Sequence, residues 1–213
     1  MSPKVPEAYL EARRAEILEA ASKCFMEKGF HHTTMQDIYH AANLSPGAVY
    51  NYFSSKEDIM VAANKQYSDW SIAEMESVKS DDPLDSLMNY IRLNLKYAAS
   101  PEIAKSISIN LDFYSEASRQ EEISKSMQKS QDATHNVLVI EITKLQQTGC
   151  INADLDPLSI ARAIMGMVFG IMIHKILEPE VDLEAFGEVC EAIFNGKFSS
   201  PPEKRRRKKK LTS

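Results

Sequence analysis

Small, polar and aromatic side chains gather near position 50 in a pattern suited to contact with a nucleic acid. Gly47 and Ala48 leave room for close approach to a groove, and the amide of Asn51 can pair with the edge of an adenine. The phenols of Tyr50 and Tyr52 are long enough to reach backbone phosphates. On one short helix, these residues would form a surface that reads bases and holds the DNA backbone.

Three helix starts surround this cluster. Thr33-Thr34-Met35-Gln36 has the Thr-x-x-Gln pattern of a capping box, and Ser54-Ser55-Lys56-Glu57 predicts a second box. Between them, Ser45 can cap a helix whose first residue is Pro46. Asn43 tolerates the positive φ of a tight turn before that helix. Two short helices joined by so short a turn predict a helix-turn-helix.

The same three helix starts can bind one polyanion. A helix N-terminus carries free amides and a partial positive charge, to which Thr33 or Thr34 adds a hydroxyl and Lys56 adds an ammonium. Clamping of duplex phosphates therefore accounts for all three starts. The spacing of the three capping motifs is also consistent with a purely structural role, because most capping motifs only begin helices. The predicted DNA contacts are Thr33, Thr34, Ser45, Pro46, Gly47, Ala48, Tyr50, Asn51, Tyr52 and Lys56.

Apolar residues recur at three- and four-residue intervals along the whole chain, without strand-like alternation. This period predicts an all-α protein of about nine helices. The first helix should bury Ile17, Ala21, Cys24 and Phe25 and end at Gly29. We expect helices near residues 9–28, 34–42, 45–53, 55–78, 84–99, 101–113, 118–148, 157–177 and 182–195.

The predicted helices divide into two domains and a tail. Residues 8–60 form a three-helix unit containing the helix-turn-helix, with Val49 and Phe53 facing its core. Residues 61–198 form a larger helical bundle. Residues 199–213 form a disordered basic tail, because prolines precede a run of cations.

Charge is distributed unevenly along the chain. It has 25 basic and 30 acidic residues, a net charge of -5. Lys204 to Lys210 supplies seven of the basic residues, which leaves 18 basic against 30 acidic residues and a net charge of -12. DNA-binding domains are usually basic, so the DNA-binding hypothesis depends on the local cluster. The tail can add salt-sensitive DNA affinity, act as a solubilising end or bind another polyanion.

The sequence also indicates the compartment. No stretch approaches roughly 18 uninterrupted apolar residues, and Met1 to Pro6 lacks an apolar secretion core. Three distant cysteines, Cys24, Cys150 and Cys190, do not have the spacing of a zinc site. We therefore expect a cytoplasmic protein without membrane contact, metal or cofactor, in which the cysteines are small buried residues. A redox-sensing Cys150, beside Gly149, is the alternative.

From Arg14 to Glu57, the sequence resembles the N-terminal signature of the TetR family of transcription regulators. That signature runs Arg-x-x-Ile-Leu-x-Ala-Ala-x-x-x-Phe, Gly-aromatic, paired threonines, Ile, Ala, and Ser-x-Gly-x-x-Tyr-x-x-Phe-x-x-Lys-Glu. So many matches over about 45 residues are far more specific than a lone short motif. Tyr39 departs from the usual alanine, and Asn43 from the usual turn glycine. The matching residues are Arg14, Ile17, Leu18, Ala20, Ala21, Phe25, Gly29, Phe30, Thr33, Thr34, Ile38, Ala42, Leu44, Ser45, Gly47, Tyr50, Tyr52, Phe53, Lys56 and Glu57.

The resemblance implies a homodimeric repressor that binds a palindromic double-stranded DNA operator and is released by a small-molecule effector. In the family, the last two long helices of each subunit form a four-helix bundle, here near residues 158–177 and 183–195. The apolar residues of the first of these helices cover more than one face, which agrees with burial on several sides. Gly166 and Gly170 would allow close helix approach, either between subunits or within one.

The larger domain would bind an apolar or aromatic effector, because its candidate lining is rich in methionine and aromatic residues. Residues of these types are more often plain core, and His135 is more often a hydrogen-bonded core histidine than a ligand contact. The candidate lining consists of Met88, Ile91, Leu95, Phe113, Tyr114, Met127, His135, Leu138, Met165 and Phe169.

The sequence disfavours two other functions and leaves a third open. An enzyme is disfavoured because the sequence has no glycine-rich phosphate loop, catalytic triad signature or carboxylate-histidine cluster, and the pair His31-His32 suits an exposed turn. A helical ligand-binding protein without DNA binding is disfavoured by the polar residues of the helix-turn-helix. Activation instead of repression depends on operator position, which the sequence does not encode.

Overall fold

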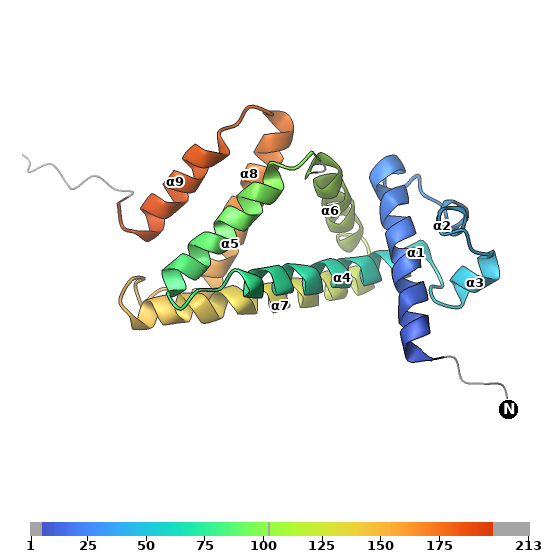
Figure 1. Ribbon diagram of the computed structural model, residues 1–213, viewed down its shortest axis with the longest axis horizontal. Coiled ribbons are helices and arrows are strands. Elements are labelled where there is room, and N and C mark those ends of the chain that lie inside the picture. Colours follow the sequence, from blue (N-terminus) through green and yellow to red (C-terminus); the bar gives the residue numbers. More distant parts are fainter. Residues whose placement is uncertain (1–5, 102, 198–213) are drawn as a thin grey trace, which may run out of the picture.

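The computed structural model describes residues 6–101 and 103–197, and this part of the chain contains nine helices and no strand (Figure 1). The all-α prediction and the number of helices are therefore confirmed. The predicted basic tail at residues 199–213 lies outside the described residues. The helices are α1 (Glu7–Lys28), α2 (Met35–Ala41), α3 (Pro46–Tyr50), α4 (Lys56–Ser77), α5 (Pro83–Ala98), α6 (Ile103–Ala117), α7 (Glu121–Gln147), α8 (Pro157–Leu177) and α9 (Leu183–Phe194).

The N-terminal turns follow from local backbone chemistry. Gly29 ends α1 with φ 77°, a value that favours glycine, and its N–H donates to the Phe25 carbonyl at 2.9 Å. Asn43 has φ 54° in the turn between α2 and α3, as the sequence predicts. Pro46 is the first residue of α3, where its missing N–H leaves no hydrogen bond unmade.

Both predicted capping boxes are wrong by one residue. Thr34 caps α2 and pairs with Asp37, not Thr33 with Gln36. Ser55 caps α4 and accepts from the Asp58 N–H at 3.1 Å, not Ser54 with Glu57. Each start has two adjacent hydroxyl residues followed by two adjacent residues that can complete such a motif, Gln36 and Asp37 or Glu57 and Asp58, so the sequence offered two registers.

Figure 1 shows the arrangement of the helices. The two long helices α4 and α7 run side by side; α5 and α8 pack against α7, and α9 packs against α5. Because α4 begins beside the small N-terminal helices and ends within the larger bundle, it belongs to both parts. The predicted boundary near residue 60 therefore falls inside a continuous helix.

The core of the N-terminal helices extends into the larger bundle. Ile17, Ala21 and Phe25 are buried against α2–α4 as predicted, and so are Val49 and Phe53. This small-domain core also includes side chains from α6 and α7. Those added residues are Phe113, Ile123 and Met127.

A second core lies among α4–α9. Cys190 is buried in it, and Cys24 is buried in α1, as expected. Cys150 is exposed, so its predicted burial is wrong: it follows Gly149 in the turn after α7, where nothing covers it among the described residues. α8 is long and apolar enough to cross a membrane by length and composition, with mean hydropathy 1.7, but it packs against α5, α6 and α7.

Candidate nucleic-acid interface and internal cavity

α3 presents a small polar surface above the small-domain core. The Ser45 hydroxyl accepts from the Ala48 N–H at 3.2 Å, which fixes the start of the helix. Val49 is fully buried and anchors α3 from below, while Tyr50 is 52% exposed. A methyl group added at Gly47 would meet nothing within 4 Å. This face is therefore open to a groove-shaped partner.

α3 is shorter than the sequence predicts. It ends at Tyr50, and Asn51 is its C-cap residue. Asn51 is exposed, whereas Tyr52 is half-buried against the small-domain core. Pro46 and Ser45 are exposed at the opposite end of the helix. The structure thus brings the predicted base-reading and phosphate-binding groups of α3 onto one surface, with Tyr52 at its edge.

Thr33 is buried, so the structure does not bring it onto the exposed surface with the other predicted DNA contacts. Only 1% of Thr33 is exposed, and its hydroxyl donates to the Gly29 carbonyl at 2.8 Å. Its physical contribution is to satisfy a carbonyl beyond the end of α1, where the helix leaves such groups unpaired.

Thr34 is exposed at the start of α2, but its polar groups are already engaged. Its hydroxyl donates to Asp37 at 2.7 Å, and its N–H donates to the same carboxylate at 2.9 Å. The Lys28 ammonium at 2.5 Å and these Thr34 bonds hold the pKa of Asp37 well below its usual range. Any phosphate contact by Thr34 would compete with this carboxylate.

Lys56 is directed into the small domain. Its Nζ donates to the carbonyls of Phe30 at 3.0 Å and Thr33 at 3.3 Å, and it lies 4.3 Å from the centre of the Phe30 ring. These bonds hold the α1–α2 turn against the start of α4. The ammonium that the sequence assigns to phosphate binding is therefore occupied by backbone oxygens.

Arg14 was not among the predicted contacts, although it belongs to the quoted signature. Its guanidinium lies 4.4 Å from the centre of the Phe53 ring and donates to the Tyr52 carbonyl at 3.5 Å. Arg14 thus fixes the segment after α3 against α1. The signal available in the sequence was only its place in the signature.

A cavity with two adjoining lobes lies in the larger bundle. The first lobe, of about 290 Å³, lies between α4 and α5, and the second, of about 140 Å³, extends among α4–α8. Tyr67, Tyr90 and Tyr97 line both lobes. The first lobe also has Trp70, Ser71, Glu74, Met75, Leu93, Asn94, Lys96 and Ser100. The second also has Asn64, Ser68, Ser71, Asn94, Ile107, Asn110, Tyr114, Met127, Ser130, Gln131, Thr134, Met165, Val168, Phe169 and Met172.

Four of the ten predicted lining residues face the second lobe: Tyr114, Met127, Met165 and Phe169. The other six do not line either lobe. Met88, Ile91 and Leu138 belong to the second core, with Leu95 packed against it, and Phe113 belongs to the small-domain core. His135 is buried in α7, and its Nδ1 has no hydrogen-bond partner among the described residues, contrary to the expectation of a hydrogen-bonded histidine.

Most of the aromatic lining of the cavity is not among the residues predicted from the sequence. Tyr67 and Trp70 lie three apart on α4, and Tyr90, Asn94 and Tyr97 follow one face of α5 at four- and three-residue spacing. Tyr67 is 43% exposed, yet burial raises its pKa to about 12, with smaller contributions from neighbouring tyrosines.

An open α3 surface, joined by one continuous helix to a bundle with a cavity, defines a helix-turn-helix DNA-binding regulator. Family models support this class: "Bacterial regulatory proteins, tetR family" matches residues 17–63, and "BetI-type transcriptional repressor, C-terminal" matches residues 83–196. The chain belongs to the TetR family of bacterial transcription regulators. It is a DNA-binding regulator of transcription and not an enzyme.

Individual relatives agree over most of the chain. An uncharacterised HTH-type transcriptional regulator of Bacillus subtilis, YfiR, is 28% identical over 196 residues, which are 88% of this chain and 93% of that protein. The fold is similar to that of the fatty acid degradation regulator FadR from Bacillus halodurans, with TM-score 0.74, 19% identity, and 93% and 100% of the two chains covered. FadR from Bacillus subtilis, solved with stearoyl-CoA, has TM-score 0.70, 21% identity, and coverage of 87% and 99%.

Proposed function

We propose that the protein is a repressor that binds a palindromic operator as a homodimer and is released by a small molecule with an apolar or aromatic body. The observation that carries this proposal is the continuity of α4. Its first residue, Lys56, holds the α1–α2 turn, and further along Tyr67 and Trp70 line the cavity. A molecule that moves α4 in the cavity would therefore move the DNA-binding helices.

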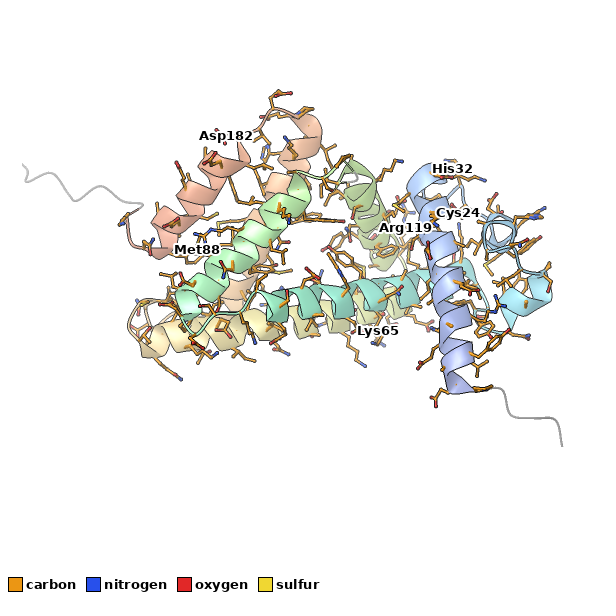
Figure 2. All side chains as sticks on the ribbon, viewed as in Figure 1. Cys24, His32, Lys65, Met88, Arg119 and Asp182 are labelled. Atoms are coloured by element: carbon orange, nitrogen blue, oxygen red, sulfur yellow. The ribbon has the colours of Figure 1, made fainter. Side chains whose placement is uncertain are left out.

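α6 provides a second connection between the cavity and the DNA-binding helices. Tyr114 lines the second lobe, while Asp112, two residues earlier, accepts from the Phe30 N–H at 2.9 Å. Near the end of α6, Glu116 is buried. Its Oε1 lies 3.6 Å from the His31 Nε2 and 3.7 Å from a terminal guanidinium nitrogen of Arg119. Figure 2 shows Arg119 close to α1. A displacement of α6 would thus shift the turn between α1 and α2.

The exposed faces of α8 and α9 support a homodimer. Only 28% of the most apolar window of α8 is buried within the subunit, and Leu177 at its end is 72% exposed. On α9, Val189 and Ile193 are exposed as well. Both helices lie at the end of the molecule away from α3 (Figure 1). Pairing through this end would cover the apolar surface and leave both α3 helices free for two operator half-sites.

The effector proposal rests on the cavity and on one relative. The Bacillus subtilis FadR structure contains stearoyl-CoA, which places a small-molecule ligand in a protein of similar fold. The cavity is concave and has a mostly apolar lining that includes aromatic side chains, as ligand sites do. Because a regulator of this kind must reach the bacterial chromosome, we expect the protein in the cytoplasm.

The test is selection of genomic fragments with the purified protein, followed by titration of the recovered site at fixed salt. We expect a palindrome, and we expect Tyr50→Ala to weaken binding at least tenfold because it removes an exposed phenol from α3. Leu155→Ala is the matched control, since Leu155 is also 52% exposed but lies in the turn before α8. No enriched fragment, or equal losses for both variants, would contradict the proposal.

A further inference from the structure

The cavity lining is mostly apolar, and nearly all of its polar groups are uncharged. None of the described residues that line the second lobe is acidic, basic or histidine. In the first lobe, Glu74 and Lys96 are the charged lining residues, and they are of opposite sign. The remaining polar groups are phenols, side-chain amides and hydroxyls, all neutral at physiological pH. The site therefore offers hydrogen bonds but little compensation for a charged ligand.

Several of these polar groups keep unused hydrogen-bonding capacity. The Asn94 amide donates to the Tyr90 carbonyl at 2.9 Å, and the Asn110 amide donates to the Ser106 carbonyl at 3.0 Å. Each amide oxygen is then left to accept, because no described group donates to it. The Tyr90 hydroxyl donates to the Met165 sulfur at 3.1 Å, a weak acceptor. The buried Ser100 Oγ in the first lobe has no partner among the described residues.

The aromatic groups give the cavity flat walls. The centre of the Trp70 ring lies 5.6 Å from that of Tyr67 and 6.2 Å from that of Tyr97. In the second lobe, Tyr114 and Phe169 meet edge to face at 5.9 Å. Rings of a ligand can stack on or insert between such faces. An unbranched alkyl chain would gain less from them and would leave the amide and hydroxyl groups unpaired.

We infer that the cavity binds an uncharged ring compound carrying several hydroxyl or carbonyl groups, and not a fatty acyl chain or its anionic thioester. This inference rests on the proposed effector function and specifies its ligand class. A thioester of the coenzyme A type carries phosphates, which require cationic partners. Lys96 is the one described lining residue that could supply such a charge, and Glu74 lines the same lobe.

The experiment compares three probes by isothermal titration calorimetry with the full chain: 2,7-dihydroxynaphthalene, its parent naphthalene, and palmitoyl-CoA. We expect the diol to bind at least tenfold more tightly than naphthalene, because its hydroxyls pair with groups that naphthalene leaves unsatisfied. Palmitoyl-CoA should bind more weakly than the diol. Equal affinity for diol and naphthalene, tighter binding of palmitoyl-CoA, or no binding of the diol overturns the inference.

Two substitutions assign the diol to the cavity. Asn94→Leu and Asn110→Leu keep side-chain size and helix propensity but remove the amide, so each should weaken diol binding about tenfold and leave naphthalene binding unchanged. Asn136→Leu is the matched control, because Asn136 is exposed on α7 and does not line the cavity. Equal diol affinity in all three variants would overturn the assignment to this cavity.

Operator binding separates the inference from the proposed function. If the diol binds as expected and also lowers operator affinity, both stand. If the diol binds in the cavity but leaves operator affinity unchanged, the inferred ligand class stands. The proposal that a ligand in this cavity releases the repressor from its operator is then contradicted.

Discussion

Lys56 offers the sharpest test of how the N-terminal helices are held. Replacing it by methionine keeps the aliphatic stem but removes the ammonium from the Phe30 and Thr33 carbonyls and from the Phe30 ring. Hydrogen bonds from a charged donor contribute about 1.5–3 kcal/mol, and an exposed cation–π contact about 0.5–1 kcal/mol. Because Lys56 is half-buried, we expect the Lys56→Met substitution to lower the free energy of unfolding by about 2 kcal/mol.

The assay is thermal unfolding combined with operator titration at several salt concentrations. A loss of about 2 kcal/mol lowers the Tm by about 4–8 °C in a chain of this size. Operator affinity should fall as well, because the α1–α2 turn loses its anchor. The salt slope of binding should stay at the wild-type value, since the ammonium is occupied by backbone oxygens and not by phosphate.

Lys65→Met is the control on the same helix. Lys65 is exposed, pairs with Asp69, and projects from the surface of α4 (Figure 2). An exposed pair of this kind contributes little, so its Tm should stay within about 2 °C of wild type. A Lys56→Met variant with wild-type Tm and a salt slope reduced by about 2 per dimer would refute our reasoning and restore Lys56 as a phosphate contact.

Three further predictions follow from the same structure. Asp112→Ala removes the acceptor of the Phe30 N–H, so it should lower the Tm by about 2–4 °C in calorimetry and weaken the response of operator binding to effector; an unchanged response would exclude α6 as a connection. Burial raises the pKa of Tyr67 to about 12 and that of Tyr90 as well, so their stabilising contribution is complete below about pH 10 and is lost as the pH rises through their folded-state values. Tyr67→Phe should therefore remove one late-titrating phenol from a near-ultraviolet titration, and loss of an ordinary one would contradict the assignment. Gly166→Arg adds a charge where a methyl group would meet nothing within 4 Å, so sedimentation should show a folded monomer, whereas an intact dimer would argue against pairing through α8.

The sequence by itself determined the helices and the family. Apolar periodicity predicted the long helices, because each must bury a stripe of side chains at the helical repeat, and capping patterns predicted the short helices α2 and α3. Local chemistry predicted the Asn43 turn and the Pro46 helix start, since both depend on the backbone of one or two residues. The signature from Arg14 to Glu57 was enough to indicate the TetR family.

Only the tertiary structure decided where several side chains point. Thr33 and Lys56 are polar residues at helix starts, and nothing local distinguishes a phosphate ligand from a group that satisfies carbonyls. The structure directs both toward the end of α1, where the Thr33 hydroxyl donates to the Gly29 carbonyl and the Lys56 ammonium donates to the Phe30 carbonyl. Thr34, one residue later, keeps its exposed position.

The cavity was also a product of the tertiary structure. Periodicity indicates that Met88 and Tyr90 both face the interior. It does not distinguish interior side chains that only pack against neighbours from those that also line a cavity. In the folded chain, both residues belong to the second core, but only Tyr90 also lines the cavity between α4 and α5. That difference depends on the packing of helices distant in sequence, which a one-dimensional pattern does not contain.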